Sequence, residues 1–103
     1  MIYIMGEEDI QIDLPLQALY FYSPYMPFHQ KFITMIGKMK DRKIPFFAID
    51  IEQFGNQGKR FTIDSIPTIL ILKNGKEIKR LTGIVPTNVF TSAFADICIP
   101  WIL

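Results

Sequence analysis

The dipeptide Asn74-Gly75, set between two strand-like segments, is the feature that most restricts how this chain can fold. Both residues tolerate the positive φ angles of a two-residue type I′ turn, so the flanking segments are expected to pair as an antiparallel hairpin. The first segment, residues 68–72, is apolar and suits a strand that is buried on both faces. The second, residues 76–81, carries several charges, which commonly protect a strand at the edge of a sheet. The sequence therefore predicts one border of a sheet and the strand beside it.

The rest of the chain alternates between strand-like and helix-like periods, which is typical of an α/β protein. Apolar runs predict three further strands, at residues 2–5, 16–22 and 44–51. Helices are expected at residues 27–40, within 52–63 and at 87–98. The chain has 103 residues and 50% of them are hydrophobic, so we expect one packed core and a single domain over residues 1–103.

Two of the expected helices carry an apolar face at helical spacing. In the first, Pro27 suits the opening turn, and the buried stripe is predicted to consist of Phe28, Phe32, Met35, Ile36 and Met39. In the last, Thr87 is the expected N-cap, and the buried face is predicted to consist of Val89, Phe90, Ala93, Phe94 and Ile97. His29 lies off the first stripe, so it is expected to be a solvated polar residue.

Charge and hydropathy exclude several classes of protein. Eleven Lys and Arg residues balance ten Asp and Glu residues, so no nucleic-acid partner is expected. No apolar run approaches the roughly 20 residues of a membrane span. The first residues turn acidic at Glu7 and Glu8, the reverse of a secretory signal, and we expect a cytoplasmic protein without a membrane partner.

The supply of chemically reactive side chains is small. Cys98 is the single cysteine, so the chain cannot close an internal disulfide, and it is expected to serve as a small apolar residue of the last helix. His29 is the single histidine, with no cysteine, Asp or Glu beside it in the loop, so no metal site is predicted. We expect no cofactor and no catalytic residue.

The chain resembles the thioredoxin family from about Leu16 to Ile97. The segment Ser65-Ile66-Pro67-Thr68, which leads into an apolar strand and a Lys-Asn-Gly hairpin, is similar to the corresponding part of a thioredoxin. Gly83 before the last helix also matches. The resemblance implies a three-layer α/β/α fold, with a mixed sheet of 4–5 strands, a C-terminal antiparallel hairpin and 3–4 helices. It also implies a cis bond between Ile66 and Pro67.

The resemblance ends at the redox motif. Thioredoxins carry Trp-Cys-Gly-Pro-Cys before their second helix, and the matching residues here are Pro24-Tyr25-Met26-Pro27-Phe28. Tyr25 and Phe28 therefore occupy the two cysteine positions, and neither side chain can exchange disulfides. The family's buried acid matches Leu19, and the lysine that often accompanies it matches Ala48. Sulfur and its proton-transfer support are missing together, so the resemblance implies a binding module and not an oxidoreductase.

The family groove indicates where a protein or peptide partner would bind. Its matching residues are Tyr25, Met26 and Pro27 of the loop, Ile66 and Pro67 at the cis bond, and Thr82, Gly83 and Ile84 beyond the hairpin. Tyr25 either touches a partner or caps the helix that follows.

Two alternatives to the adaptor stay open at this level. One is an enzyme related to thiol oxidoreductases that uses Cys98. The other is a structural subunit that assembles as a homodimer through apolar surfaces. The apolar segment 99–103, which contains Trp101, either folds back onto the domain or docks onto another chain.

Overall fold

The computed structural model describes residues 1–38 and 44–98, with the backbone alone described for 96–98. A five-stranded mixed sheet runs through the molecule in the order β1-β3-β2-β4-β5. The strands are β1 (Ile2–Tyr3), β2 (Leu16–Tyr22), β3 (Phe46–Asp50), β4 (Thr68–Lys73) and β5 (Lys76–Thr82). The predicted central strand, β2, is confirmed, and the predicted strands at 2–5 and 44–51 are shorter than expected.

The register of the sheet brings four chain segments to one end of it. Tyr22 at the end of β2 pairs with Asp50 at the end of the parallel strand β3. On the other side of β2, Phe21 pairs with Thr68 at the start of the antiparallel strand β4, and Thr68 pairs with Thr82 at the end of β5. We call this the loop end of the sheet, because the connections after β2, before β4 and after β5 all begin or finish there.

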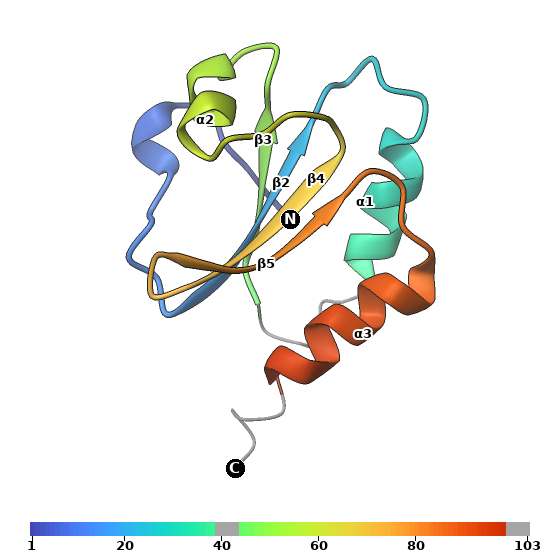
Figure 1. Ribbon diagram of the computed structural model, residues 1–103. Helices are drawn as coiled ribbons and strands as arrows, with labels where there is room; N and C mark the ends of the chain where they lie inside the picture. The colour runs from blue at the N-terminus through green and yellow to red at the C-terminus, as the bar shows by residue number, and fades with distance from the viewer. Residues whose placement is uncertain (39–43, 99–103) are drawn as a thin grey trace.

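Helices cover both faces of the sheet and create three layers (Figure 1). Helices α1 (His29–Gly37) and α3 (Thr87–Cys98) lie on one face, and α2 (Gly55–Arg60) and the short 3-10 helix η1 (Glu7–Asp9) lie on the other. Side chains of β2 alternate between the two layers, as the pleat of a strand requires. Tyr20 belongs to the α1/α3 layer, and Leu19 and Phe21 belong to the other. The predicted three-layer α/β/α architecture is confirmed.

The hairpin between β4 and β5 has the predicted form. Asn74 and Gly75 have φ angles of 52° and 82°. A β-carbon on Gly75 would lie 3.0 Å from the carbonyl oxygen of Ile12, so close packing adds to the conformational demand for glycine. Strand β5 is the predicted edge strand, and most of its side chains are exposed.

The start of α1 differs from the prediction. The helix begins at His29, and Phe28 is its N-cap, since the carbonyl of Phe28 accepts the first helical hydrogen bond, from the amide of Phe32. Pro27 therefore lies before the helix and not in its first turn. Phe28 is 43% exposed, so its predicted place in the buried stripe is wrong. The predicted Met39 lies outside the described residues.

Helix α3 spans the predicted residues, with two corrections. The amide of Phe90 donates to the carbonyl of Pro86, so Pro86 is the cap and Thr87 is the first helical residue. Val89 is exposed rather than buried, whereas Phe90 and Phe94 pack in the core as predicted. The side chain of the predicted Ile97 lies outside the described residues.

Helix α2 ends in a Schellman motif without glycine. The amide of Ile63 donates to the carbonyl of Gly58, and the amide of Thr62 donates to that of Lys59. The motif requires a left-handed residue after the helix, and Thr62 fills this position with a φ of 56°. A β-branched side chain is rarely found in this conformation.

Candidate functional site

The loop after β2, residues 23–28, is anchored at its start by Ser23. Ser23 is buried, and its hydroxyl donates to a carboxylate oxygen of Glu52 at 3.3 Å. The same oxygen of Ser23 accepts a hydrogen bond from the amide of Tyr25 at 3.2 Å, and the Ser23 carbonyl accepts one from the amide of Met26. These bonds fold the first half of the loop into a tight turn directly beyond the sheet.

The end of the same loop is anchored by His29. Its ring stacks on the ring of Tyr22 with a centroid distance of 4.4 Å and an interplanar angle of 5°. The hydroxyl of Tyr20 lies 3.0 Å from Nδ1 of His29. The rings of Tyr20 and Tyr22 are themselves stacked at 5.2 Å. The prediction that His29 is a solvated polar residue is therefore wrong, because the ring is half-buried in an aromatic cluster.

The pKa values of this cluster favour the uncharged form of each group. Burial, followed by the neighbouring Tyr22 and Tyr3, raises the pKa of Tyr20. Burial lowers the pKa of His29, although the carboxylate of Asp50 acts in the opposite direction. At neutral pH the Tyr20 hydroxyl accordingly donates to the unprotonated Nδ1 of a neutral His29, whose proton is on Nε2.

A signal for this cluster was present in the sequence. Tyr20 and Tyr22 are two positions apart on a strand, so they share one face of it. Helix α1 follows the same strand after a short loop and covers that face. A histidine in its first turn is thus brought over the two rings. The cluster was not predicted because the buried face of the helix was assigned from a periodicity starting at Phe28, which places His29 on the exposed face.

Between its two anchors the loop exposes apolar surface. Tyr25 is 84% exposed. It was predicted either to touch a partner or to cap the following helix, and no capping contact of its side chain is found among the described residues. Phe28, the N-cap of α1, is also exposed, at 43%. Met26 is half-buried and packs against the α1/α3 layer, as does Val85 from the connection before α3. The loop therefore presents two aromatic rings on a fixed base.

The second predicted segment, at Ile66 and Pro67, lies at the same end of the sheet. The bond between these residues is cis. Pro67 is buried, and its carbonyl accepts a hydrogen bond of 2.8 Å from the amide of Gly83. Ile66 is half-buried against the α2 layer. Among the described residues, none forms a hydrogen bond with the backbone of Ile66.

The third predicted segment follows β5. Gly83 has a φ of 77°, and a β-carbon there would meet no atom within 4 Å. Thr82 and Ile84 are exposed on either side of it. The sheet register thus brings all three predicted segments to the loop end.

The described residues place no thiol at the loop end. Leu19 and Ala48, which occupy the positions of the family's acid and lysine, are both buried and apolar. No three His, Cys, Asp or Glu side chains gather as metal ligands in the part of the chain that the structure describes. Cys98 ends α3, a helix of 12 residues that begins near the loop end, so its backbone is roughly 16 Å along the helix axis from Thr87.

No helix within residues 1–38 and 44–98 has the length and apolar character needed to cross a membrane.

A family model described as thioredoxin matches residues 15–96. The chain belongs to the thioredoxin family. With one cysteine in its sequence, this thioredoxin-family chain has no Cys-x-x-Cys pair. The family assignment confirms the resemblance predicted from the sequence.

Similarity to individual thioredoxins is partial in sequence. The chain is 28% identical over 57 residues to Thioredoxin-1 of Saccharomyces cerevisiae, an alignment that covers 53% of this chain and 55% of that protein. It is 30% identical over 71 residues to the chloroplastic Thioredoxin Y of Oryza sativa subsp. japonica, covering 66% of this chain and 42% of that one. The chain thus spans about half the length of the curated relatives it matches.

Similarity in structure extends over almost the whole chain. The oxidised thioredoxin of Plasmodium falciparum superposes with a TM-score of 0.85 over 94% of this chain and 97% of that one, at 16% identity. Thioredoxin O2 of Arabidopsis thaliana superposes with a TM-score of 0.82 over 92% and 91%, at 13% identity. At these identities the superpositions establish the thioredoxin fold alone.

Proposed function

We propose that this chain is a redox-inactive thioredoxin-fold adaptor that binds an extended segment of a partner protein at the loop end of the sheet. The binding surface consists of Tyr25, Met26, Pro27 and Phe28, of Ile66 and Pro67, and of Thr82, Gly83 and Ile84. No cofactor or metal takes part.

The main support for the proposal is that aromatic residues occupy the positions of the two cysteines in the thioredoxin motif. Tyr25 and Phe28 replace both sulfur atoms and stay exposed instead of entering the core. Tyr and Phe are enriched at protein interfaces relative to the rest of the surface. Their loop is anchored at both ends, by Ser23 and by His29, so little ordering would be required when a partner binds.

The mode of binding follows from the backbone at Ile66. An extended peptide adds to a protein through main-chain hydrogen bonds and gains specificity from side-chain contacts. The backbone of Ile66 has no hydrogen-bonding partner among the described residues, and it lies at the same end of the sheet as the aromatic loop. A partner strand would pair with Ile66 and place apolar side chains against Tyr25 and Phe28.

The alternative of a thiol-dependent enzyme has less support. An exchange reaction requires a thiolate beside the bound substrate and a second sulfur to resolve the mixed disulfide. Cys98 is the last residue of α3, and it lies at the terminus of that helix farther from the loop end of the sheet. The sequence contains no second cysteine.

Selection of binding peptides from a random library tests the surface directly. Selected peptides should be apolar, and titration of the labelled protein should shift the amide resonances of Tyr25, Ile66 and Gly83. Tyr25→Ala should weaken binding by about tenfold or more, the effect of removing an aromatic hot spot. Met5→Ala is the matched control, because Met5 is 82% exposed, close to the value for Tyr25, and lies outside the proposed surface. Equal effects of both variants would contradict the proposal.

A second experiment tests the lack of redox activity. Insulin reduction with a dithiol recycling system should give no turnover above the buffer rate. Turnover that disappears in Cys98→Ser would end the adaptor hypothesis and favour the enzyme.

A further inference from the structure

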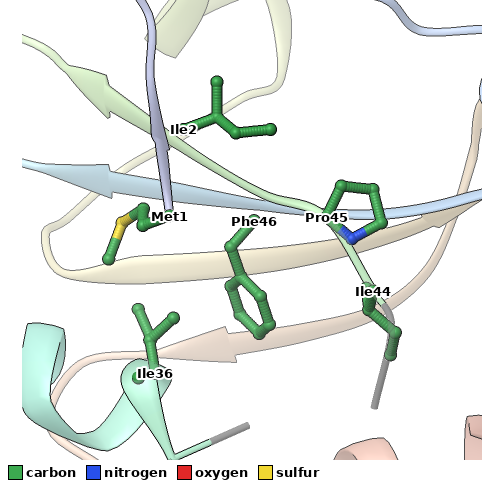
Figure 2. Close-up of a pocket in the computed structure, with 7 residues that line it drawn as sticks. Met1, Ile2, Ile36, Ile44, Pro45 and Phe46 are labelled. Carbon is green, nitrogen blue, oxygen red and sulfur yellow. The ribbon is translucent and has the colours of Figure 1, made fainter. Parts of the chain in front are cut away.

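An apolar pocket of about 170 Å³ lies at the opposite end of the sheet from the proposed binding surface. It is formed by the last turn of α1, the start of β3 and the first residues of the chain (Figure 2). Its side chains are those of Met1, Ile2, Ile36, Ile44, Pro45 and Phe46, and Gly37 completes the lining. Every side chain in this lining is apolar, so the pocket is suited to an apolar group.

Part of this lining is left open to solvent. Met1 and Ile2 are both more than 40% exposed, although each contributes a large apolar side chain. Figure 2 shows Met1, Ile36 and Phe46 arranged around one space. Covering these side chains would remove apolar surface from water, which favours the covered state.

The last turns of α3 lie close to this pocket. The ring of Phe94 lies 5.1 Å from the ring of Phe46, which belongs to the pocket wall. Cys98, the last helical residue, is four residues beyond Phe94, about 6 Å along the helix axis. The chain thus leaves α3 within about one helical turn of the pocket.

The segment that follows α3 has the chemistry that the pocket requires. Residues 99–103 read Ile-Pro-Trp-Ile-Leu and have no charged side chain, and their one polar side-chain group is the indole N–H. Extended residues span about 3.3 Å each, so three of them reach roughly 10 Å beyond Cys98. A segment joined to the domain also binds at a high effective concentration, which favours it over a separate molecule of similar chemistry.

We propose that segment 99–103 folds back and packs into this pocket, with the indole of Trp101 as its main contact. The contact closes the exposed apolar surface at Met1 and Ile2 and fastens α3 to the start of β3. It involves no residue of the loop end, so it stands or falls independently of the proposed adaptor function.

Trp101 is the only tryptophan of the chain, and its fluorescence therefore reports on this segment alone. In the full-length protein the emission maximum should be blue-shifted relative to the same protein in denaturant, and acrylamide should quench it less. The blue shift should not change with protein concentration. An emission maximum equal to that of the denatured chain would refute the proposal. A blue shift that appears only on concentration, together with a dimer in light scattering, would also refute it, because a second copy would then supply the segment.

The variant Gly37→Glu tests the pocket itself. A β-carbon at Gly37 meets no atom within 4 Å, so the domain should fold with a carboxylate at the pocket mouth. Gly55→Glu is the matched control, since a β-carbon at Gly55 in α2 is equally unhindered. Trp101 emission should move to the denatured value in Gly37→Glu and stay unchanged in Gly55→Glu. Unchanged emission in both folded variants would overturn the proposal.

A second matched pair covers the case in which Gly37→Glu does not fold. Ile2 is 49% exposed in the pocket lining, and Ile78 is 46% exposed on β5 at the other edge of the sheet. Ile2→Glu should shift the emission of Trp101 to longer wavelength, and Ile78→Glu should not. Equal emission in the two variants would contradict the assignment of the pocket.

Discussion

Replacing His29 with alanine is predicted to destabilise the protein by about 2–4 kcal/mol. The change removes the acceptor of the Tyr20 hydroxyl, a group on a side chain with no exposed surface. A buried donor left without a partner costs about 1–3 kcal/mol. The change also removes the stacked contact with Tyr22, which contributes about 0.5–1.5 kcal/mol.

A double-mutant cycle separates the two contributions. Tyr20→Phe removes the hydroxyl and leaves Nδ1 of the half-buried His29 within reach of water, so it should cost only about 0.5–1.5 kcal/mol. In the Tyr20→Phe background, His29→Ala no longer leaves a buried hydroxyl unpaired and loses only the stacking. The two substitutions should therefore show a coupling energy of about 1–3 kcal/mol, the cost of the unpaired hydroxyl.

Urea unfolding of the four proteins, analysed by linear extrapolation, measures these differences. Thr34→Ala in the same helix is a suitable control. It removes an exposed hydrogen bond to the carbonyl of Gln30 and should change stability by less than about 0.5 kcal/mol. If the costs of Tyr20→Phe and His29→Ala add within about 0.5 kcal/mol, the hydroxyl and the ring do not interact and the reasoning is refuted.

Three further predictions concern pH and two backbone sites. Burial lowers the pKa of His29 in the folded protein, so in acid the unfolded chain binds more protons than the folded one. The stability that the neutral ring contributes is therefore present above the unfolded pKa of about 6.5 and is lost as the pH falls below it. The stability difference between wild type and His29→Ala should thus shrink in acid, and a constant difference would contradict this. Thr62→Gly should stabilise by about 1 kcal/mol in urea unfolding, because glycine adopts the left-handed conformation without cost, and a loss of stability would exclude strain at Thr62. Arg80→Met should cost about 1–2 kcal/mol in thermal unfolding, because its guanidinium donates to the carbonyls of Phe61 and Thr62, whereas the control Glu77→Gln removes only an exposed ion pair and should cost less than about 1 kcal/mol. Equal costs would show that the carbonyl contacts contribute nothing.

The elements that could be predicted from sequence are those specified by local chemistry. The hairpin at Asn74-Gly75 depends on two residues that accept positive φ angles, and both adopt them. Strand β2 could be predicted because an almost unbroken apolar run suits a strand that is covered on both faces. Helix α3 has the predicted bounds because Gly83 and Pro86 precede its periodic segment.

The errors occur where tertiary contacts override periodicity. Phe28 has the spacing of a buried position, but the helix starts one residue later, and the cap residue points away from the core. His29 has the spacing of an exposed position, but Tyr20 and Tyr22 offer it a flat aromatic surface and a hydroxyl donor. The exposure of Phe28 and the burial of His29 are not determined by their neighbours within one helical turn. Both depend on where the chain leaves β2.

The candidate site likewise has features that could be predicted from the sequence and features that could not. The positions of Tyr25 and Phe28 could be assigned from the family motif, and so could the cis bond at Pro67. What fixes the loop could not, because Ser23 acts through Glu52, 29 residues away, and His29 acts through Tyr20, nine residues away. A motif match locates a loop but does not report the contacts that hold it.

Those contacts bear on why the loop should be ordered at all in a chain without the redox pair. A disulfide exchange centre needs a fixed loop because two sulfur atoms must meet in one geometry. Here that requirement is gone, yet Ser23 and His29 hold the two ends of the loop. Ordering the backbone of this six-residue loop costs roughly 1–2 kcal/mol of conformational entropy for each residue. The anchoring contacts must offset this cost. A surface that is ordered before its partner arrives does not incur this cost on binding. The proposed adaptor function therefore accounts for an anchored loop that exposes Tyr25.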